Sequence, residues 1–386
     1  MAEWFKAAVL KTVVPKVPWD YFKSYLFRHT RKKNMIDEAK IDKAAESIQK
    51  MMEKEYGKES VGLMSDEDSL SNISISCSSR SDVVDFVLLA GRELGVDGKL
   101  VPFGRVLGIA GLEAAGKSTL CAQIAAETQK IGGLVIFVDT EDRVDQTYFE
   151  QLGVNTSKVI SIRENKIEDI FRKQFMLINH IKKVFPDVPV ALFWDSIGGS
   201  SLLKEDEDPM GDESYGKEAK KMAQGLKQIN HLIAKSKIAY VYTNHLYAKM
   251  NAGMGDPWET SGGQKLKYFT TVLLILKKVG QITEIDENGN KTTIGNKVLV
   301  RAKKNSMGPI QREMEAAVIG GRGFDNDWTV RELAENKKII AKAGAWSTCK
   351  FPSGKEVKFQ GWNGFLEKVV TDPEYPELKK LAWAKL

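Results

Sequence analysis

The sequence has few cysteines and no hydrophobic run long enough to cross a membrane. Its three cysteines are scattered and form neither a metal-binding nor a redox spacing. The longest apolar runs, Val106–Leu112 and Val188–Trp194, have the length of buried strands and fall far short of the roughly 18 residues that a transmembrane helix needs. These absences exclude a disulfide scaffold and a membrane partner. They favour a cytoplasmic protein.

Positive charge is concentrated at the start of the sequence. The 386 residues have a formal net charge of +6, and residues 1–33 alone hold eight lysines and arginines against two acids. The other residues are therefore neutral overall. A basic arm on a neutral body is a common signature of a polyanionic partner, and a solvated tail without a partner is the alternative. Hydrophobic content of 42% and charged content of 28% exclude a disordered or collagen-like chain.

Short apolar segments alternate with helical segments from about residue 83 onward. Four of them have the length and composition of buried strands, and these are 105–110, 134–138, 188–194 and 238–243. A helix is expected at 117–130. Short apolar strands that alternate with helices form a parallel sheet with both faces covered. The sequence therefore predicts an α/β fold for the middle of the chain.

Different patterns precede this middle region. Apolar residues recur at helical spacing over Met35–Tyr56, which predicts an amphipathic helix that ends at Gly57. Residues 65–82 contain eight serines and are typical of a linker. A short alternating stretch within it, at 73–77, fits a strand.

The pattern changes again after the predicted parallel sheet. Apolar segments at 269–276 and 298–302 lie on either side of a turn signal at 287–290, which predicts a hairpin. Residues 326–386 contain four tryptophans and weak helix signals. We expect them to form a separate small domain.

A complete phosphate-binding motif follows the first predicted strand. It matches G-x-x-x-x-G-K-[ST] over Gly111, Leu112, Glu113, Ala114, Ala115, Gly116, Lys117 and Ser118, with Thr119 next. The glycines allow the backbone to wrap around phosphates, and amides at the start of the following helix point at them. Lys117 is expected to neutralise the β and γ oxygens, and Ser118 to bind Mg²⁺.

Polar side chains end three of the other predicted strands. Asp195 follows the third strand, where a carboxylate can hold Mg²⁺ through water; a helix-capping role is the alternative. Glu141 follows the second strand and can orient an attacking water, with Asp139 as the competing choice. A lone histidine is more often structural. However, His245 follows the fourth strand at the same sheet edge, which favours a contact with the γ-phosphate.

These residues resemble the bacterial RecA-type recombinases in order and spacing. The phosphate loop, Asp139-Thr-Glu141, Asp195-Ser196 and Asn244-His245 all match. Outside the nucleotide site the resemblance includes a subunit-docking segment at Glu55–Lys58, a first DNA loop with Met210-Gly211 inside Leu203–Gly216, a second DNA loop at Thr260–Gly263 with Leu266–Tyr268 as the strand that leaves it, and the start of a C-terminal domain at Lys342–Trp346. It covers residues 35–386, nearly the whole chain.

For the nucleotide, the resemblance implies ATP with Mg²⁺ and names further site residues. Glu141 takes the place of the catalytic carboxylate. Asp145 and Tyr148 are expected to flank the adenine, with the tyrosine ring stacked on it. His245 stands where the family has a glutamine that senses the γ-phosphate, and an imidazole can still donate a hydrogen bond there.

The resemblance also implies that a neighbouring subunit completes the ATP site. Lys303 matches one of two lysines that reach the neighbour's ATP. The second position is Asn305 here, so Lys304 is expected to substitute by a one-residue shift. Charge supplied by a neighbour can raise a phosphoryl-transfer rate by roughly 10³–10⁵. A pair of solvated lysines is the alternative.

The second loop, which as a whole spans Tyr247–Gly263, has residues suited to single-stranded DNA. Lys249 can meet a phosphate, and Met250 can wedge between bases. Trp258 can stack on a base, which contributes on the order of 1–3 kcal/mol, or it can pack on the core. Together with the backbone of the first loop, the DNA-binding set is Met210, Gly211, Lys249, Met250, Trp258, Ser261, Gly262 and Gly263.

We therefore predict an α/β fold built on a RecA-like P-loop ATPase core, with a mainly parallel sheet covered by helices. The expected parts are a basic arm (1–34), a docking helix and linker (35–82), the ATPase core with two DNA loops (83–325) and a small α/β C-terminal domain (326–386). The resemblance implies a DNA recombinase that forms a homo-oligomeric helical filament on single-stranded DNA and exchanges it with double-stranded DNA. It would act in the bacterial cytoplasm, whether a cell or a phage encodes it. A ring-shaped motor of the helicase type and a regulatory ATP-binding protein are the alternatives.

Overall fold

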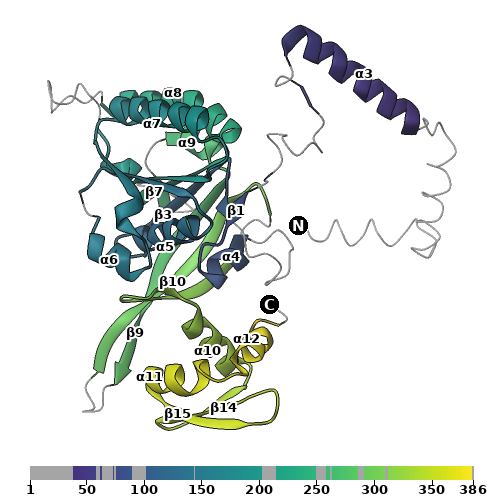
Figure 1. Cartoon of the computed structure of the whole chain (residues 1–386). Coiled ribbons are helices and arrows are strands. Elements are labelled where there is room, and N and C mark those ends of the chain that lie inside the picture. The colour runs from purple at the N-terminus through teal and green to yellow at the C-terminus, as the bar shows by residue number, and fades with distance from the viewer. Residues whose placement is uncertain are drawn as a thin grey trace, which may run out of the picture. The chain divides into compact units, whose positions relative to one another are not determined.

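The structure is a computed structural model of the whole chain (Figure 1). It describes residues 38–57, 61–62, 73, 75–88, 101–142, 144–201, 214–248, 258–260, 263–285, 291–308 and 312–384. The chain divides into two compact units, Met1–Asn72 and Ile73–Leu386. None of the described helices is both long and apolar enough to cross a membrane.

The first unit contains the predicted amphipathic helix, α3 (Glu38–Tyr56). Its apolar residues Ile41, Ile48 and Met51 are all more than half exposed. Gly57 follows with φ of 88°, a conformation that glycine adopts without strain, and its N–H donates to the carbonyl of Glu53 at 2.9 Å. The prediction of a helix that ends at Gly57 is confirmed.

The second unit is organised around one large sheet. Its strands are β3 (Arg105–Gly111), β4 (Leu134–Asp139), β5 (Val159–Arg163), β6 (Val190–Asp195), β7 (Ile238–Ala248), β9 (Val272–Ile285), β10 (Lys291–Asn305), β11 (Glu313–Ile319) and β12 (Gly323–Asp325). They lie in the order β12-β11-β10-β9-β3-β7-β6-β4-β5, and β8 (Trp258–Thr260) pairs with the end of β7. In this spatial order the six neighbours β9, β3, β7, β6, β4 and β5 are parallel to one another. Strands β10, β11 and β12 extend the sheet beyond β9 in antiparallel pairs. The predicted α/β fold with a mainly parallel sheet is confirmed.

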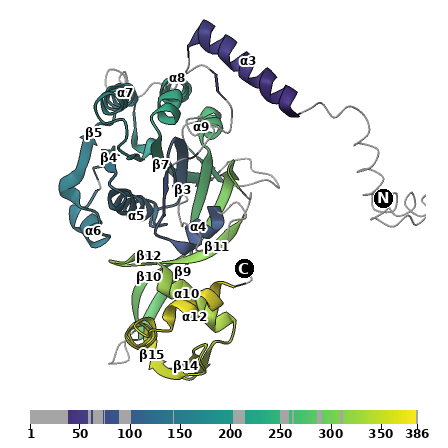
Figure 2. The same ribbon diagram turned by 45° about the vertical axis from the view of Figure 1, so that its right-hand side comes forward.

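Helices cover both faces of this sheet (Figures 1 and 2). One face packs against α4 (Asp82–Leu88), α5 (Lys117–Lys130) and α6 (Gln146–Gln151), and the other against α7 (Ile167–Val184), α8 (Ser214–Lys235) and α9 (Gly263–Phe269). A small two-stranded sheet, β1 (Ser76–Cys77) with β2 (Val101–Pro102), adjoins the first face. The predicted helix at 117–130 is reproduced at both ends.

Several predicted boundaries differ from the structure. Strand β7 continues past the predicted 238–243, and β9 begins at Val272 because Phe269 ends helix α9. The hairpin strands β9 and β10 extend beyond the predicted 276 and 298–302, because their outer halves are largely exposed and have no regular apolar pattern. Leu266–Tyr268, predicted as a strand, lies in helix α9. Leu266 and Phe269 are three residues apart and both pack in the same core cluster, a spacing that fits a helix face and not an alternating strand.

Residues 326–384 form a small three-stranded sheet with helices beside it. The elements are α10 (Asn326–Asn336), β13 (Ile340–Ala343), β14 (Trp346–Lys350), β15 (Glu356–Gln360), α11 (Gly361–Phe365), the π-helical turn η5 (Leu366–Val370) and α12 (Tyr375–Trp383). The Glu284 carboxylate on β9 accepts from the backbone N–H of Trp362 at 2.6 Å. Lys379 pairs with Asp82 on α4 at 2.5 Å. One continuous hydrophobic cluster runs from α4 and α5 through to Trp383.

Candidate functional site

The predicted nucleotide residues meet at the carboxyl ends of β3, β4, β6 and β7. They line a pocket of about 240 Å³, whose walls are Glu113, Ala114, Ala115, Gly116, Lys117, Ser118, Thr119, Asp139, Glu141, Val144, Asp145, Tyr148, Phe149, Asp195 and His245. Parallel strands place these ends at one edge of the sheet, which is where open α/β sheets bind ligands. Segments that are 100 residues apart in sequence therefore supply one site.

Two glycines of the phosphate loop are required by the surrounding packing. Gly116 has φ of 86°, and a Cβ there would lie 3.2 Å from the ring of Phe324. A Cβ on Gly111 would lie 2.6 Å from the carbonyl oxygen of Leu276. Helix α5 begins directly after this loop at Lys117, so its first amides have no partner inside the helix and face the pocket. The helix dipole and these amides together favour an anion such as phosphate.

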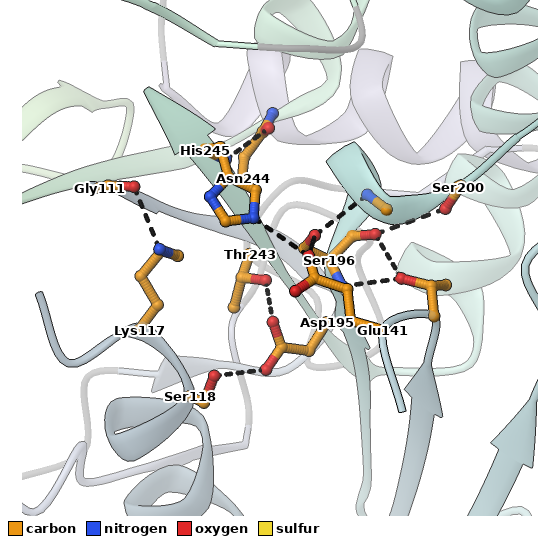
Figure 3. Close-up of polar contacts among 12 residues, drawn as sticks. Gly111, Lys117, Ser118, Glu141, Asp195, Ser196, Ser200, Thr243, Asn244 and His245 are labelled. Carbon is orange, nitrogen blue, oxygen red and sulfur yellow. Dashed lines mark hydrogen bonds and ion pairs between the residues drawn. The ribbon is translucent and has the colours of Figure 1, made fainter. Parts of the chain in front are cut away.

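Lys117 is held at the mouth of the loop by two backbone carbonyls. Its ammonium donates to the carbonyl of Gly111 at 3.1 Å (Figure 3) and to that of Leu112 at 3.0 Å. Burial lowers the pKa of Lys117, while the nearby carboxylates of Asp195 and Glu141 act in the opposite direction. An ammonium that donates to neutral carbonyls can donate to negatively charged phosphate oxygens in their place.

Asp195 is the centre of a second group of contacts. Its Oδ2 accepts from the Ser118 hydroxyl at 2.6 Å, and its Oδ1 accepts from the Thr243 hydroxyl (Figure 3). Hydroxyl and carboxylate oxygens are the donors that Mg²⁺ prefers, and this ion usually keeps several waters and shares its site with phosphates. No cluster of three or more metal-binding side chains occurs among the described residues. Ser118 and Asp195 therefore suit an Mg²⁺ that arrives with a nucleotide.

Glu141 is the centre of a third group. Its Oε1 lies 3.1 Å from Nε2 of His245 and also accepts from the Ser196 hydroxyl (Figure 3). Asp139, the competing carboxylate, instead accepts from the backbone N–H groups of Glu141 and Val144, both at 3.1 Å. Both acids line the pocket, but their contacts differ. Asp139 is held by backbone N–H groups of the turn after β4, whereas Glu141 contacts the side chains of Ser196 and His245.

Three hydroxyl groups around these carboxylates, those of Thr140, Ser196 and Thr243, have no role in the prediction from sequence. Ser196 begins the short helix η3 (Ile197–Gly199), and its backbone N–H donates to the Thr140 hydroxyl at 3.0 Å. The Thr140 hydroxyl in turn donates to the Ser196 carbonyl at 2.7 Å. Thr243 directly precedes Asn244 and His245 on β7. Their positions in the sequence could have indicated them, because all three residues lie next to the polar residues that were predicted to form the site.

The predicted adenine residues lie at the start of α6. Asp145 caps this helix, accepting from the backbone N–H of Tyr148 at 3.0 Å. The Tyr148 hydroxyl lies 2.8 Å from that of Thr119 on α5. Both Asp145 and Tyr148 line the pocket. The two residues are thus brought to the phosphate loop, as the prediction requires.

The lysine pair lies on β10, away from this pocket. Ala302 is opposite Leu274 and Lys304 is opposite Leu273, so Lys303 is the extra residue of a β-bulge. Asn305 is buried, and its side-chain amide donates to the carbonyl of Leu88 at 3.2 Å. Lys304 donates to the carbonyls of Lys267 at 2.8 Å and Tyr268 at 3.3 Å on α9.

Most of the predicted DNA-binding residues lie outside the described residues, namely Met210, Gly211, Lys249, Met250, Ser261 and Gly262. Two are described. Trp258 is half-buried on β8 and packs beside the cluster formed by Ala110, Leu246, Leu273 and Ile275, so packing accounts for part of its surface. Gly263 is the first residue of α9, with φ of 71°.

The chain is similar to known proteins over most of its length. Residues 43–325 match the family model described as the RecA N-terminal domain. The chain is 31% identical over 327 residues to Protein RecA of Citrifermentans bemidjiense, covering 85% of this chain and 90% of that protein. It is 33% identical over 304 residues to Protein RecA of Allochromatium vinosum, covering 79% and 82%. It is 31% identical over 338 residues to Protein RecA of Deinococcus radiodurans, covering 88% and 86%.

Proposed function

The chain belongs to the RecA family, and on this premise we propose that it is an ATP-dependent DNA recombinase. It would assemble as a helical filament on single-stranded DNA, hydrolyse ATP and catalyse homologous pairing and strand exchange with double-stranded DNA. The observation that carries this proposal is the contact between Glu141 and His245. It joins the candidate catalytic carboxylate to β7, the strand that continues toward the predicted second DNA loop.

ATP binding would rearrange the three groups of contacts in the pocket. The phosphates would lie on the amides at the start of α5, and Lys117 would exchange the carbonyls of Gly111 and Leu112 for phosphate oxygens. Ser118 and Asp195 would hold Mg²⁺, which neutralises charge on the β and γ oxygens. Tyr148 would stack on the adenine, and Asp145 would flank it.

His245 would link the γ-phosphate to the DNA loop. A neutral imidazole has one N–H, so its Nε2 can donate either to Glu141 or to a γ-phosphate oxygen. Arrival of the γ-phosphate would therefore draw His245 away from the carboxylate. Glu141 is then available to orient and polarise the attacking water. His245 is followed directly by the residues of β7 that pair with β8, and so any movement reaches the ends of the predicted loop.

A neighbouring subunit would complete the site. We propose that Lys303 reaches the neighbour's phosphates and that α3 docks on the next subunit through its exposed apolar face. The parts proposed from the sequence remain the basic arm 1–34, the docking segment 35–82, the ATPase core 83–325 and the C-terminal domain 326–386. In a protein that must accept any DNA sequence, homology would be tested by base pairing and not by contacts with bases.

The first test is ATP hydrolysis by the full chain with and without single-stranded DNA at two salt concentrations. We expect DNA to stimulate hydrolysis strongly and the stimulation to fall as salt rises, because phosphate contacts release counterions. Homopolymeric DNA lacking secondary structure serves as the probe. Equal rates with and without DNA would contradict the recombinase proposal and favour the motor or regulatory alternative.

Ser196 should matter for turnover and not for ATP binding. Its hydroxyl donates to Glu141 but does not line the pocket. Because a hydrogen bond to a charged group contributes about 1.5–3 kcal/mol, we expect Ser196→Ala to lower kcat roughly tenfold with unchanged ATP affinity. Steady-state kinetics and a nucleotide titration measure the two quantities.

Ser200→Ala is the matched control for this change. It removes the hydroxyl of the residue that directly follows η3. This hydroxyl accepts from the Trp194 indole N–H at 3.2 Å and donates to the Ser196 carbonyl at 3.4 Å, and it does not contact Glu141. If kcat falls equally in both variants, the effect comes from the turn as a whole, and the proposal that the Ser196 hydroxyl supports Glu141 in turnover is wrong.

A further inference from the structure

Lys304 is bound to a helix in this structure and not exposed as a free cation. Its ammonium donates to the carbonyl oxygens of Lys267 at 2.8 Å and Tyr268 at 3.3 Å. An ammonium has three donors, so these contacts use most of its capacity. Burial lowers the pKa of Lys304, in keeping with its lying against the helix.

The two carbonyls belong to the last turn of α9, where a helix leaves its carbonyls without internal partners. The neighbouring carbonyl, that of Leu266, is taken by Thr270, whose backbone N–H donates at 3.1 Å and whose hydroxyl donates at 2.7 Å. Lys304 thus completes the C-terminal cap of α9. A cation at this end of a helix is also favoured by the helix dipole.

Helix α9 is tied in turn to the strand that precedes it. Lys267 on α9 pairs with Glu259 on β8 at 3.0 Å. Glu259 lies opposite Tyr247 on β7, two residues beyond His245. A continuous series of contacts therefore runs from β10 through α9 and β8 to the end of β7.

The bulge on β10 explains why a lysine is available for this contact. Ala302 and Asn305 are both buried, and a regular strand would place residue 304 on the same face as Ala302. The extra residue Lys303 changes the alternation, so that Asn305 faces the core and Lys304 lies opposite Leu273 on the other face. Asn305 fills its buried position with a hydrogen bond to Leu88.

We propose that Lys304 is a positioning residue that fixes α9, and with it the β8 end of the predicted second DNA loop, to the strand that carries Lys303. It does not replace the lysine missing at Asn305. This inference rests on the proposed function, in which the loop binds DNA and Lys303 reaches a neighbour's ATP. The two adjacent lysines then have separate roles: Lys304 affects DNA affinity, and Lys303 affects ATP hydrolysis.

The experiment compares Lys304→Met with Lys303→Met in the full chain. For Lys304→Met we expect about a tenfold loss of apparent affinity for single-stranded DNA, since two charge-assisted hydrogen bonds are lost, and less than about a twofold change in kcat at saturating DNA. For Lys303→Met we expect kcat to fall by about 10³-fold while DNA affinity with a slowly hydrolysed ATP analogue is retained. Lys304→Arg, which can also donate to two carbonyls, should restore the DNA affinity.

Amide hydrogen exchange gives a readout that does not depend on DNA or ATP. Exchange over Gly263–Phe269 should rise in Lys304→Met and stay at the wild-type level in Lys303→Met and in Lys291→Met. The last variant removes one positive charge from the start of the same strand and serves as the control for charge alone.

Two results would overturn the inference. One is a loss of kcat in Lys304→Met equal to that in Lys303→Met, which would place Lys304 at the neighbour's phosphates. The other is wild-type exchange of α9 together with wild-type DNA affinity in Lys304→Met. If instead the wild-type protein shows no DNA-stimulated hydrolysis, the proposed function fails and the exchange result alone still tests the cap.

Discussion

Replacing Glu141 with glutamine should stop ATP hydrolysis while leaving ATP and DNA bound. Glutamine has nearly the same shape and keeps an oxygen that can accept from Ser196 and His245, but it has no negative charge to polarise water. General-base catalysis contributes typically 10²–10⁴-fold, so we expect kcat to fall by about that factor. The measurement is phosphate release, with DNA dissociation followed by fluorescence anisotropy.

Glu150→Gln is the matched control for this variant. It makes the same change of charge on α6, outside the phosphate pocket, where Glu150 accepts from Gln146 at 2.9 Å. It should hydrolyse ATP at the wild-type rate. A Glu141→Gln protein that turned over normally would return the choice to Asp139, even though that carboxylate is already engaged by two backbone amides.

Replacing Lys117 with alanine should abolish nucleotide binding at working concentrations. Lys117 belongs to the phosphate loop and lines the pocket, and its ammonium is held there by two backbone carbonyls. Truncating one partner of a buried charge pair costs about 2–5 kcal/mol, so we expect ATP affinity to fall by about 10²- to 10³-fold. Titration with a fluorescent ATP analogue measures the change.

Lys130→Ala tests whether this effect is specific to the loop. Lys130 lies at the other end of α5, where it pairs with Glu127 on the surface, so its loss removes the same charge from the same helix. It should bind ATP normally. Thermal unfolding of both variants separates lost binding from lost folding, and unchanged ATP affinity in a folded Lys117→Ala protein would refute the phosphate assignment.

The fold and the nucleotide pocket could be predicted because their signals are local. The strand that ends at Gly111 and the helix that begins at Lys117 follow from apolar runs and from a loop whose glycines have no substitute. Glu141, Asp195 and His245 could be predicted to lie close together because parallel strands place their ends at one edge of the sheet. None of these inferences needs knowledge of which side chains touch.

The contacts that decide the roles of these residues are not local and could not be predicted. Asp139 and Glu141 are equivalent in sequence, and what separates them is which one accepts the amide of Val144. The strand expected at Leu266–Tyr268 followed from the family resemblance alone, and these residues lie in helix α9. The contact between Lys304 and α9 joins residues 37 positions apart and depends on a bulge. A single extra residue does not change the amino-acid composition of a strand, so the bulge could not be predicted from the sequence.

The continuous core has a consequence for how the molecule unfolds. The Trp383 ring packs 5.8 Å from that of Phe86 on α4, which also lies under the Arg312 guanidinium at 4.5 Å. Because the last helix and the nucleotide-binding sheet share these contacts, they gain their free energy of folding together and should melt in one cooperative transition. Cutting the chain after Asp325 would expose the apolar face of α4 to water. In thermodynamic terms the C-terminal sheet is then part of the same folding unit as the large sheet.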